Sequence, residues 1–144
     1  MSGDDWVNEK RKLSLMKIEH LAIWVSDLEK MKNFYEKYFN ASSNELYHNP
    51  TKNFRSYFLS FESGCRLELM QKPEIPDNLN DLEKQYKGII HFAISVGSRE
   101  KVDQLTEQLR TENCQIVGEP RTTGDGYYES VVLDPEGNRI EITI

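Results

Sequence analysis

Four residues of the chain have side chains that could together hold a divalent metal ion: His20, Glu68, His91 and Glu141. The chain has only three histidines, and two of them occupy similar apolar segments, Ile18–Val25 and Ile89–Val96. Carboxylates that are removed from water need a cation or a paired donor. Two imidazoles and two carboxylates supply nitrogen and oxygen donors that suit zinc, nickel, cobalt, iron(II) or manganese. We therefore expect one divalent ion per site, with positions left open for water or substrate.

An internal repeat places these four residues at equivalent positions of two copies. The segment around His20 matches the segment around His91 at an offset of 71 residues (91 − 20). The segment around Glu68 matches that around Glu141 at an offset of 73 (141 − 68), so that one loop differs by two residues. The repeat divides the chain into a polar extension at 1–16 and a single domain at 17–144, which consists of module 1 at about 17–71, a linker at 72–87 and module 2 at about 88–144.

Each module has the pattern of a strand, a helix and further strands. Apolar residues alternate over 20–25 and 91–96, which is typical of strands with one face on a core. A capping box at Ser26–Glu29 and an N-cap at Ser98 predict the two helix starts. Further strands are predicted at 54–61, 66–70, 128–133 and 139–144.

Period-two alternation puts each histidine and each glutamate of the set opposite the apolar face of its strand. If helices cover the apolar faces, the opposite faces turn inward to a shared cleft, and the four side chains point into it. The third histidine, His48, is expected in a surface loop, and the linker is expected to contain at most a short helix near Leu82–Tyr86.

Composition excludes several classes of protein. The chain of 144 residues is 38% hydrophobic and 29% charged, as expected for one globular domain. Its net charge of −6 argues against a nucleic-acid partner. No apolar run approaches the roughly 18 residues that a membrane span needs, and the first residues lack a secretory pattern. Cys65 and Cys114 have no metal-site spacing and are expected to be free thiols, which favours a cytoplasmic location.

The duplicated pattern resembles the vicinal oxygen chelate superfamily, which includes glyoxalase I, bleomycin-resistance proteins, methylmalonyl-CoA epimerase, fosfomycin-resistance enzymes and extradiol dioxygenases. The resemblance is carried by four segments: Ile18–Ile23, Arg66–Glu68, Ile90–Ile94 and Leu133–Glu141. It implies an α+β fold of two tandem βαβββ modules, which form curved mixed sheets around a metal cleft. It also implies a homodimer, because members of the family commonly dimerise.

Similarity to glyoxalase I implies a metal-dependent lyase or isomerase, similar to lactoylglutathione lyase, with His20, Glu68, His91 and Glu141 as the metal ligands. The implied reaction is proton transfer next to a carbonyl of a small substrate with vicinal oxygens, such as a hemithioacetal. Glu141 is implied as the base and Glu68 as the second ligand carboxylate. Strand parity adds Trp24, Arg66 and Arg139 as substrate contacts, although each could instead be a core or hairpin salt-bridge residue.

Two alternatives remain open within the same fold. By the same resemblance, extradiol dioxygenases would have a site of two histidines and one carboxylate, without the glutamate of the first module. Antibiotic-sequestering relatives are non-catalytic binding proteins and generally lack the ligand set. Glu68 therefore favours the lyase or isomerase over the dioxygenase, and the complete ligand set argues against the binding protein.

Overall fold

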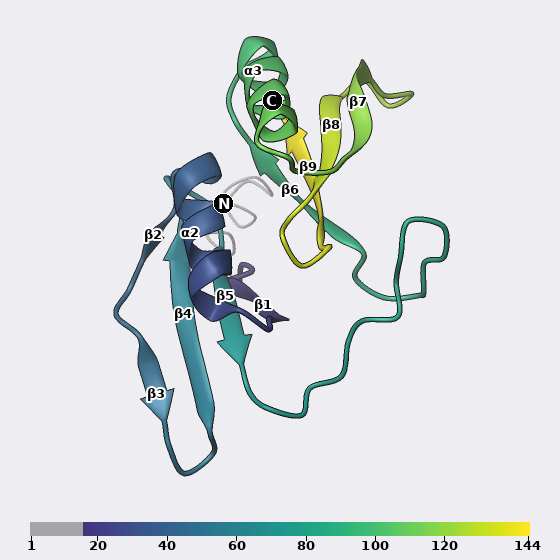
Figure 1. Ribbon diagram of the computed structural model, residues 1–144. Coiled ribbons are helices and arrows are strands. Elements are labelled where there is room, and N and C mark those ends of the chain that lie inside the picture. The colour runs from purple at the N-terminus through teal and green to yellow at the C-terminus, as the bar shows by residue number, and fades with distance from the viewer. Residues whose placement is uncertain (1–15) are drawn as a thin grey trace, which may run out of the picture.

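The computed structural model describes residues 16–144, which form two βαβββ modules joined by a long linker (Figure 1). Of the predicted polar extension, only Met16 belongs to the described part of the chain. Among residues 16–144, no helix is long and apolar enough to cross a membrane.

Module 1 consists of one helix on a five-stranded sheet, which we call sheet A. Its elements are β1 (His20–Trp24), α2 (Leu28–Phe39), β2 (Ser42–Ser43), β3 (Tyr47–Asn49), β4 (Phe54–Ser60) and β5 (Arg66–Gln71). The strand order is β1-β5-β4-β2, and β3 also pairs with β4. Only the β1–β5 pair is parallel.

Module 2 repeats this arrangement with a four-stranded sheet, sheet B. Its elements are β6 (His91–Ser95), α3 (Arg99–Thr111), β7 (Ile116–Thr122), β8 (Tyr128–Leu133) and β9 (Arg139–Thr143). The strand order is β6-β9-β8-β7, and again the first pair is parallel. The two-module architecture predicted from the sequence repeat is therefore confirmed.

Strand registers in the two sheets are equivalent as well. His20 lies opposite Arg66 across the parallel pair of sheet A, and Ala22 lies opposite Glu68. His91 lies opposite Arg139 in sheet B, in the same relation. Each sheet thus has a face that carries the histidine and the glutamate, which we call its histidine face, and an opposite face that packs on a helix.

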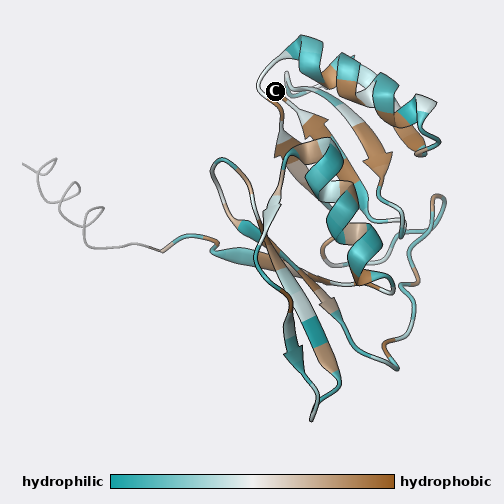
Figure 2. Cartoon of the chain, turned by 60° about the vertical axis from the view of Figure 1, so that its left-hand side comes forward, coloured by the Kyte–Doolittle hydropathy of each residue, from teal (hydrophilic) through white to brown (hydrophobic). Residues whose placement is uncertain are grey.

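The helix faces of both sheets form the core. Leu67 and Leu69 of β5 are buried under α2, and Ile140 and Ile142 of β9 are buried under α3. In Figure 2 the apolar colour concentrates on the strands, whereas the visible sides of both helices are largely hydrophilic. Apolar residues recurring at helical spacing supply the covering layer. The helix residues that are buried are Leu28, Met31, Phe34, Tyr35, Phe39, Val102, Thr106 and Leu109.

The start of α2 differs from the prediction by one residue. The N-cap is Asp27, whose extended backbone leaves its carboxylate free to accept from the backbone N–H of Lys30 at 3.0 Å. Ser26 does not cap, and its own backbone N–H donates to the Glu136 carboxylate of module 2 at 2.6 Å. In α3 the predicted N-cap Ser98 is confirmed, since its hydroxyl accepts from the Lys101 N–H.

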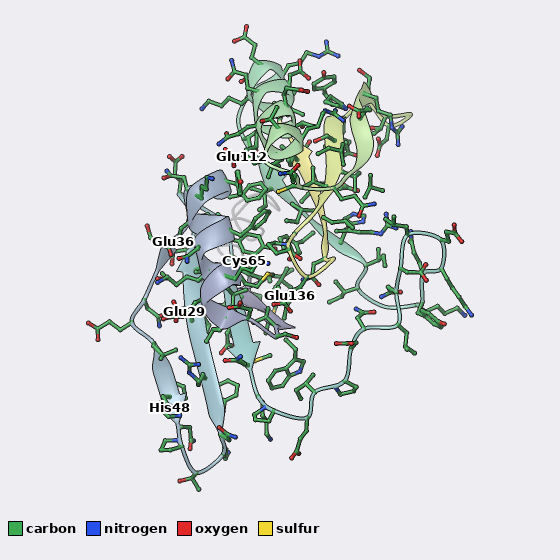
Figure 3. All side chains as sticks on the ribbon, in the orientation of Figure 1. Glu29, Glu36, His48, Cys65, Glu112 and Glu136 are labelled. Atoms are coloured by element: carbon green, nitrogen blue, oxygen red, sulfur yellow. The ribbon has the colours of Figure 1, made fainter. Side chains whose placement is uncertain are left out.

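Helix α2 also forms the contact between the modules. The buried Tyr35 hydroxyl donates to Asp134 of the β8–β9 turn at 2.8 Å, and the Tyr35 ring lies 6.2 Å from that of Phe92. Near the other end of the helix, Lys37 pairs with Glu112 at 2.9 Å. Figure 3 labels Glu112 and Glu136 near the two ends of α2. Since Phe92 lies on the helix face of sheet B, that face contacts α2 as well as α3.

The structure adds short strands that the sequence pattern did not predict, namely β2, β3 and β7. His48 belongs to β3 opposite Arg55, not to a loop as predicted, and it is exposed. The linker forms turns and extended chain, with no helix near Leu82–Tyr86.

Candidate metal centre

Module 1 contributes the pair His20 and Glu68. Because β1 and β5 run in parallel, the histidine lies two residues before the position opposite the glutamate, and both side chains emerge on the histidine face. The His20 Nε2 atom lies 3.7 Å from Glu68 Oε1. The imidazole is 41% exposed and its ring stands edge-on to Phe58, with the centroids 5.3 Å apart, whereas the glutamate is 14% exposed.

Module 2 contributes the equivalent pair, His91 and Glu141. Their Nε2 and Oε1 atoms lie 2.9 Å apart. The imidazole is 42% exposed and the glutamate 20% exposed, nearly the values of the first pair. In each pair, therefore, a partly exposed imidazole side chain faces a carboxylate that is mostly shielded from water.

The spacing within each pair fits two donors to one divalent ion. Donors about 2.1 Å from an ion lie roughly 3.0 Å apart at octahedral positions and roughly 3.4 Å apart at tetrahedral positions. The separations of 2.9 and 3.7 Å bracket this range. The chemistry of the donors agrees, since imidazole with carboxylate suits a borderline divalent ion such as zinc, nickel or manganese.

A single copy brings the four predicted ligands together as two pairs. Within residues 16–144, no group of three or more histidine, cysteine, aspartate or glutamate side chains is close enough to hold an ion. The four candidate ligands thus do not meet at one point within the described part of a single chain, and the shared cleft stays a prediction. The two pairs belong to separate sheets, His20 and Glu68 to sheet A and His91 and Glu141 to sheet B.

His20 has a second acidic neighbour, Glu19, which the sequence pattern did not single out. The His20 Nδ1 atom lies 2.5 Å from Glu19 Oε2, and the other oxygen of Glu19 pairs with Arg66. The hydrogen bonds to His20 and to Arg66 lower the pKa of the Glu19 carboxyl. The Arg66 guanidinium also lies 4.2 Å above the centre of the Phe58 ring. Arg66 therefore makes a salt bridge to the residue just before β1, and its predicted contact with substrate stays a prediction.

Module 2 has a different additional acid, Glu129 of β8, which the sequence pattern also did not single out. Val131 lies opposite Glu141 in the antiparallel pair, so Glu129, two residues earlier, shares its face of the sheet. Burial raises the pKa of the Glu129 carboxyl, and the neighbouring Glu141 carboxylate raises it further. The equivalent position in module 1 is the buried Ser56, so only sheet B carries this second carboxylate.

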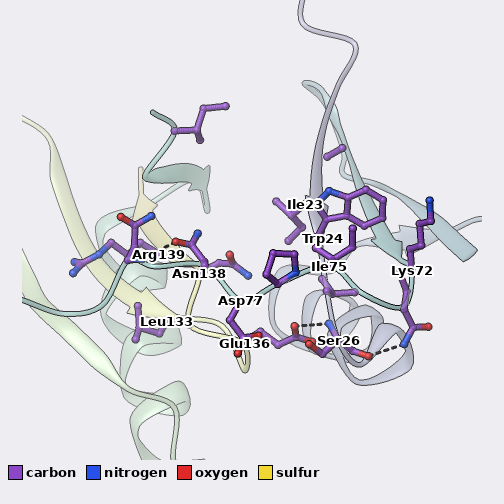
Figure 4. A pocket seen from close by; sticks show the side chains of 18 of the residues that line it. Ile23, Trp24, Ser26, Lys72, Ile75, Asp77, Leu133, Glu136, Asn138 and Arg139 are labelled. Carbon is purple, nitrogen blue, oxygen red and sulfur yellow. Dashed lines mark hydrogen bonds between the residues drawn. The ribbon is translucent and has the colours of Figure 1, made fainter. Parts of the chain in front are cut away.

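The two other predicted substrate contacts line a crevice of about 1080 Å³ between the modules (Figure 4). Trp24 lies on the side of module 1 and is 42% exposed, with its ring edge-on to Phe54. Arg139 lies on the side of module 2 and donates to the backbone carbonyls of the linker residues Asp81 and Leu82. His91 also lines the crevice, so the space reaches the second pair.

Comparison with known families agrees with this geometry. The sequence profile of the Glyoxalase/Bleomycin resistance protein/Dioxygenase superfamily matches residues 17–142, nearly the whole described chain. The chain belongs to this superfamily. The resemblance inferred from the sequence motifs is therefore confirmed at the level of family and fold.

Relatives found by comparison share about a quarter of their residues with this chain. YqjT of Bacillus subtilis (strain 168), an uncharacterized protein, is 26% identical over 132 residues, which cover 87% of this chain and 96% of YqjT. A possible glyoxalase from Bacillus cereus is 26% identical, with a TM-score of 0.67 over 90% of this chain and 99% of that one. The trypanothione-dependent glyoxalase I of Leishmania major is 23% identical, with a TM-score of 0.69, and covers 89% of this chain and 86% of its own. The last likeness concerns the fold alone.

The remaining candidate residues lie away from the two pairs. His48 is on β3, at the end of module 1 that Figure 3 shows far from α3. Cys65 and Cys114 are both free thiols, as expected from their spacing.

Proposed function

We propose that this protein is a divalent-metal-dependent lyase or isomerase, similar to lactoylglutathione lyase, which transfers a proton next to a carbonyl of a small substrate with two vicinal oxygens. The single observation that carries this proposal is the pair of His–Glu sites at equivalent positions of the repeat. Each pair has donor spacing suited to one ion, and together they supply the two nitrogens and two carboxylate oxygens of a complete site.

A second copy of the chain would complete the site. Strands β1 and β6 each lie at the edge of a sheet, and no strand among the described residues pairs with their outer sides. The residues just before them, Ile18 and Ile89, are 67% and 81% exposed at equivalent positions of the repeat. Exposed apolar side chains beside an unpaired strand edge are features of an interface.

In a twofold dimer, the β1 edge of one copy would meet the β6 edge of the other, and the same contact would form twice. Each contact would join a His20–Glu68 pair to a His91–Glu141 pair. Two identical sites would result, each with four protein donors from two chains. We therefore propose that the protein functions as a homodimer.

The residues of the site then have separate roles. His20 and His91 would hold the ion through Nε2, the atom that faces the carboxylate in each pair. Glu141 would take the proton from one carbon and return it to the next, as a positioned general base. Glu68 would remain the second ligand carboxylate. A bound divalent ion supplies a Lewis acid that polarises the two substrate oxygens and stabilises the negative charge developing on them.

The test combines metal content with turnover. Protein purified without chelator should contain about one zinc, nickel, cobalt, manganese or iron ion per chain, measured by elemental analysis. His20→Ala and His91→Ala should each lose this ion, whereas His48→Ala, the matched control at the exposed third histidine, should keep it. Wild-type protein that neither contains nor takes up such an ion would contradict the proposal.

Turnover then separates the lyase or isomerase from the alternatives. Hemithioacetals of methylglyoxal with glutathione, trypanothione or another thiol are the substrates to assay. Glu141→Gln and Glu68→Gln should each lower kcat/KM by at least about 100-fold, since each removes a carboxylate from the site. Oxygen uptake with a catechol and iron(II) would instead indicate the dioxygenase. Unchanged binding of a ligand by Glu68→Gln, with no turnover by the wild type, would indicate a binding protein.

A further inference from the structure

Glu19 forms a hydrogen-bonded chain with the first predicted metal ligand. One carboxylate oxygen lies 2.5 Å from His20 Nδ1, and the other accepts from the Arg66 guanidinium. Arg66 lies opposite His20 in the parallel strand pair, and its backbone N–H also donates to the Glu19 carbonyl at 2.9 Å. Both carboxylate oxygens of Glu19 are therefore hydrogen-bonded, which fixes the position of this carboxylate beside the His20 imidazole.

This contact determines which nitrogen of His20 can bind an ion. A neutral imidazole carries one N–H, and the partner of one nitrogen sets the tautomer. A carboxylate can only accept, so Glu19 favours the proton on Nδ1. The lone pair is then left on Nε2, the nitrogen that faces Glu68 at 3.7 Å. Ligand histidines in metal sites commonly use this arrangement, in which the second carboxylate fixes the ring and raises its basicity.

Module 2 lacks the equivalent carboxylate. Ile90 precedes His91 at the position that Glu19 holds before His20. Arg139, the counterpart of Arg66, donates to linker carbonyls. Between residues 16 and 144, no hydrogen bond reaches Nδ1 of His91, and only its Nε2 is paired, with Glu141. The two halves of the site thus differ in how firmly their histidines are oriented.

We propose that Glu19 is a positioning residue of the metal centre, which holds His20 as the Nδ1–H tautomer so that Nε2 is the ligand atom. This inference rests on the proposed function, because it needs an ion at His20. Glu19 itself donates nothing to the ion and does not touch the substrate.

The first experiment measures Zn²⁺ affinity of the full chain by competition with a chromophoric chelator. Glu19→Ala should weaken binding by about 10- to 100-fold, the usual effect of removing such a partner. Glu19→Gln keeps an acceptor oxygen for Nδ1–H and should restore part of the affinity. Glu45→Ala, which removes an exposed carboxylate from another loop, should bind as the wild type does.

Arg66→Met separates the histidine contact from the salt bridge. This variant keeps the carboxylate beside His20, so its Zn²⁺ affinity should stay within about threefold of the wild type. A loss equal to that of Glu19→Ala would overturn the proposal, because it would assign the effect to the ion pair. Unchanged affinity in Glu19→Ala, with normal binding by the wild type, would overturn the role of Glu19 alone. A wild type that binds no Zn²⁺ would overturn the metal centre, and this role with it.

The second experiment observes the tautomer directly in metal-free protein. Long-range ¹H–¹⁵N spectra should resolve three imidazoles, because the chain has three histidines. Recorded at a pH where the rings are neutral, the His20 ring should be the Nδ1–H form in the wild type. It should shift toward the Nε2–H form in Glu19→Ala, while the exposed His48 ring stays unchanged. The same His20 tautomer in both proteins would overturn the proposal, whatever the metal affinities.

Discussion

The two histidines of the candidate centre occupy equivalent positions but have unequal surroundings. His20 is bound by Glu19 on Nδ1 and lies 3.7 Å from its partner carboxylate, whereas His91 lies 2.9 Å from Glu141. Glu129 adds a second carboxylate only in sheet B. The repeat therefore supplies a symmetric set of ligands within an asymmetric set of neighbours.

The sequence was sufficient to single out the four candidate ligands but not their neighbours. His20, Glu68, His91 and Glu141 were found because scarce histidines and matched glutamates recur at fixed offsets. Glu19 and Glu129 have no counterpart in the other copy, so the repeat gives no signal for them. Glu19 could have been noticed as an acid directly before a strand histidine. Glu129 becomes visible only when the register of β8 against β9 is known.

Asp134 is a buried acid whose protonation is coupled to stability. Its side chain is 4% exposed and accepts from the Tyr35 hydroxyl and from backbone and side-chain N–H groups of Asn138. Burial raises the pKa of Asp134, and these donors oppose the rise. In the native protein this carboxyl therefore binds a proton at higher pH than in the unfolded chain. Its contribution to stability falls as the pH rises from about 3.9 through the native pKa.

The substitution Tyr35→Phe should make the stability of the protein depend more steeply on pH and extend this dependence to higher pH. Loss of the hydroxyl donor raises the pKa of Asp134 further and leaves the carboxylate short of a partner, at a cost of about 1–3 kcal/mol near neutral pH. The cost should shrink in acid, where the carboxyl is protonated. Urea unfolding between about pH 4 and pH 8 measures both effects. Tyr47→Phe, at a half-exposed ring, is the control. A difference between wild type and Tyr35→Phe that does not vary with pH would contradict this account.

The periodic spacing of apolar residues predicted the strands and helices that have one face on the core. Strands β1, β4, β5, β6, β8 and β9 lie within a few residues of their predicted ranges, and both helices begin within one residue of their predicted starts. Ser42–Ser43 and Tyr47–Asn49 are too short and polar to show a period, and both form only because β4 offers partners. Strand β7 contains Gly118 and Pro120 and has irregular register against β8, which hides it from a period-two search.

The start of α2 depends on a residue from the other module. Two backbone N–H groups at this end, those of Ser26 and Asp27, donate to the Glu136 carboxylate at 2.6 and 2.8 Å. A carboxylate there satisfies orphan donors and interacts favourably with the helix dipole. Glu136 lies in the same turn as Asp134, so one turn of module 2 binds both the start and the middle of α2.

Glu136→Ala should therefore lower the free energy of unfolding by about 1 kcal/mol, the usual cost of losing such a capping interaction. Chemical denaturation followed by circular dichroism measures the change. Glu100→Ala is the matched control, because Glu100 lies in the first turn of α3 and makes no hydrogen bond to the described residues. Its substitution should cost a few tenths of a kcal/mol at most. Equal losses in both variants would show that the contact between the modules contributes nothing.

At the scale of the whole molecule, the packing of the modules determines where a complete centre can form. Local patterns predicted two histidine faces, but they contain no information on how two similar modules dock. That docking depends on pairs far apart in sequence, such as Tyr35 with Asp134 and Ser26 with Glu136. Among residues 16–144, the four candidate ligands form two separate pairs, each beside a sheet edge that no described strand pairs with. A dimer in which the β1 edge of one chain meets the β6 edge of the other would join a His20–Glu68 pair to a His91–Glu141 pair.

Complementation between two inactive chains tests this assembly. One chain carries His20→Ala with Glu68→Gln, and the other carries His91→Ala with Glu141→Gln, so that each alone lacks half of every site. If the sites form between chains, a mixed dimer contains one site with all four ligands and one with none. Random pairing on co-expression then makes about a quarter of all sites complete. Metal content and turnover should therefore recover to about a quarter of the wild-type values, while light scattering should report a dimer throughout. Sites formed within one chain would give no recovery in the mixture, and a monomer in solution would remove the interface itself.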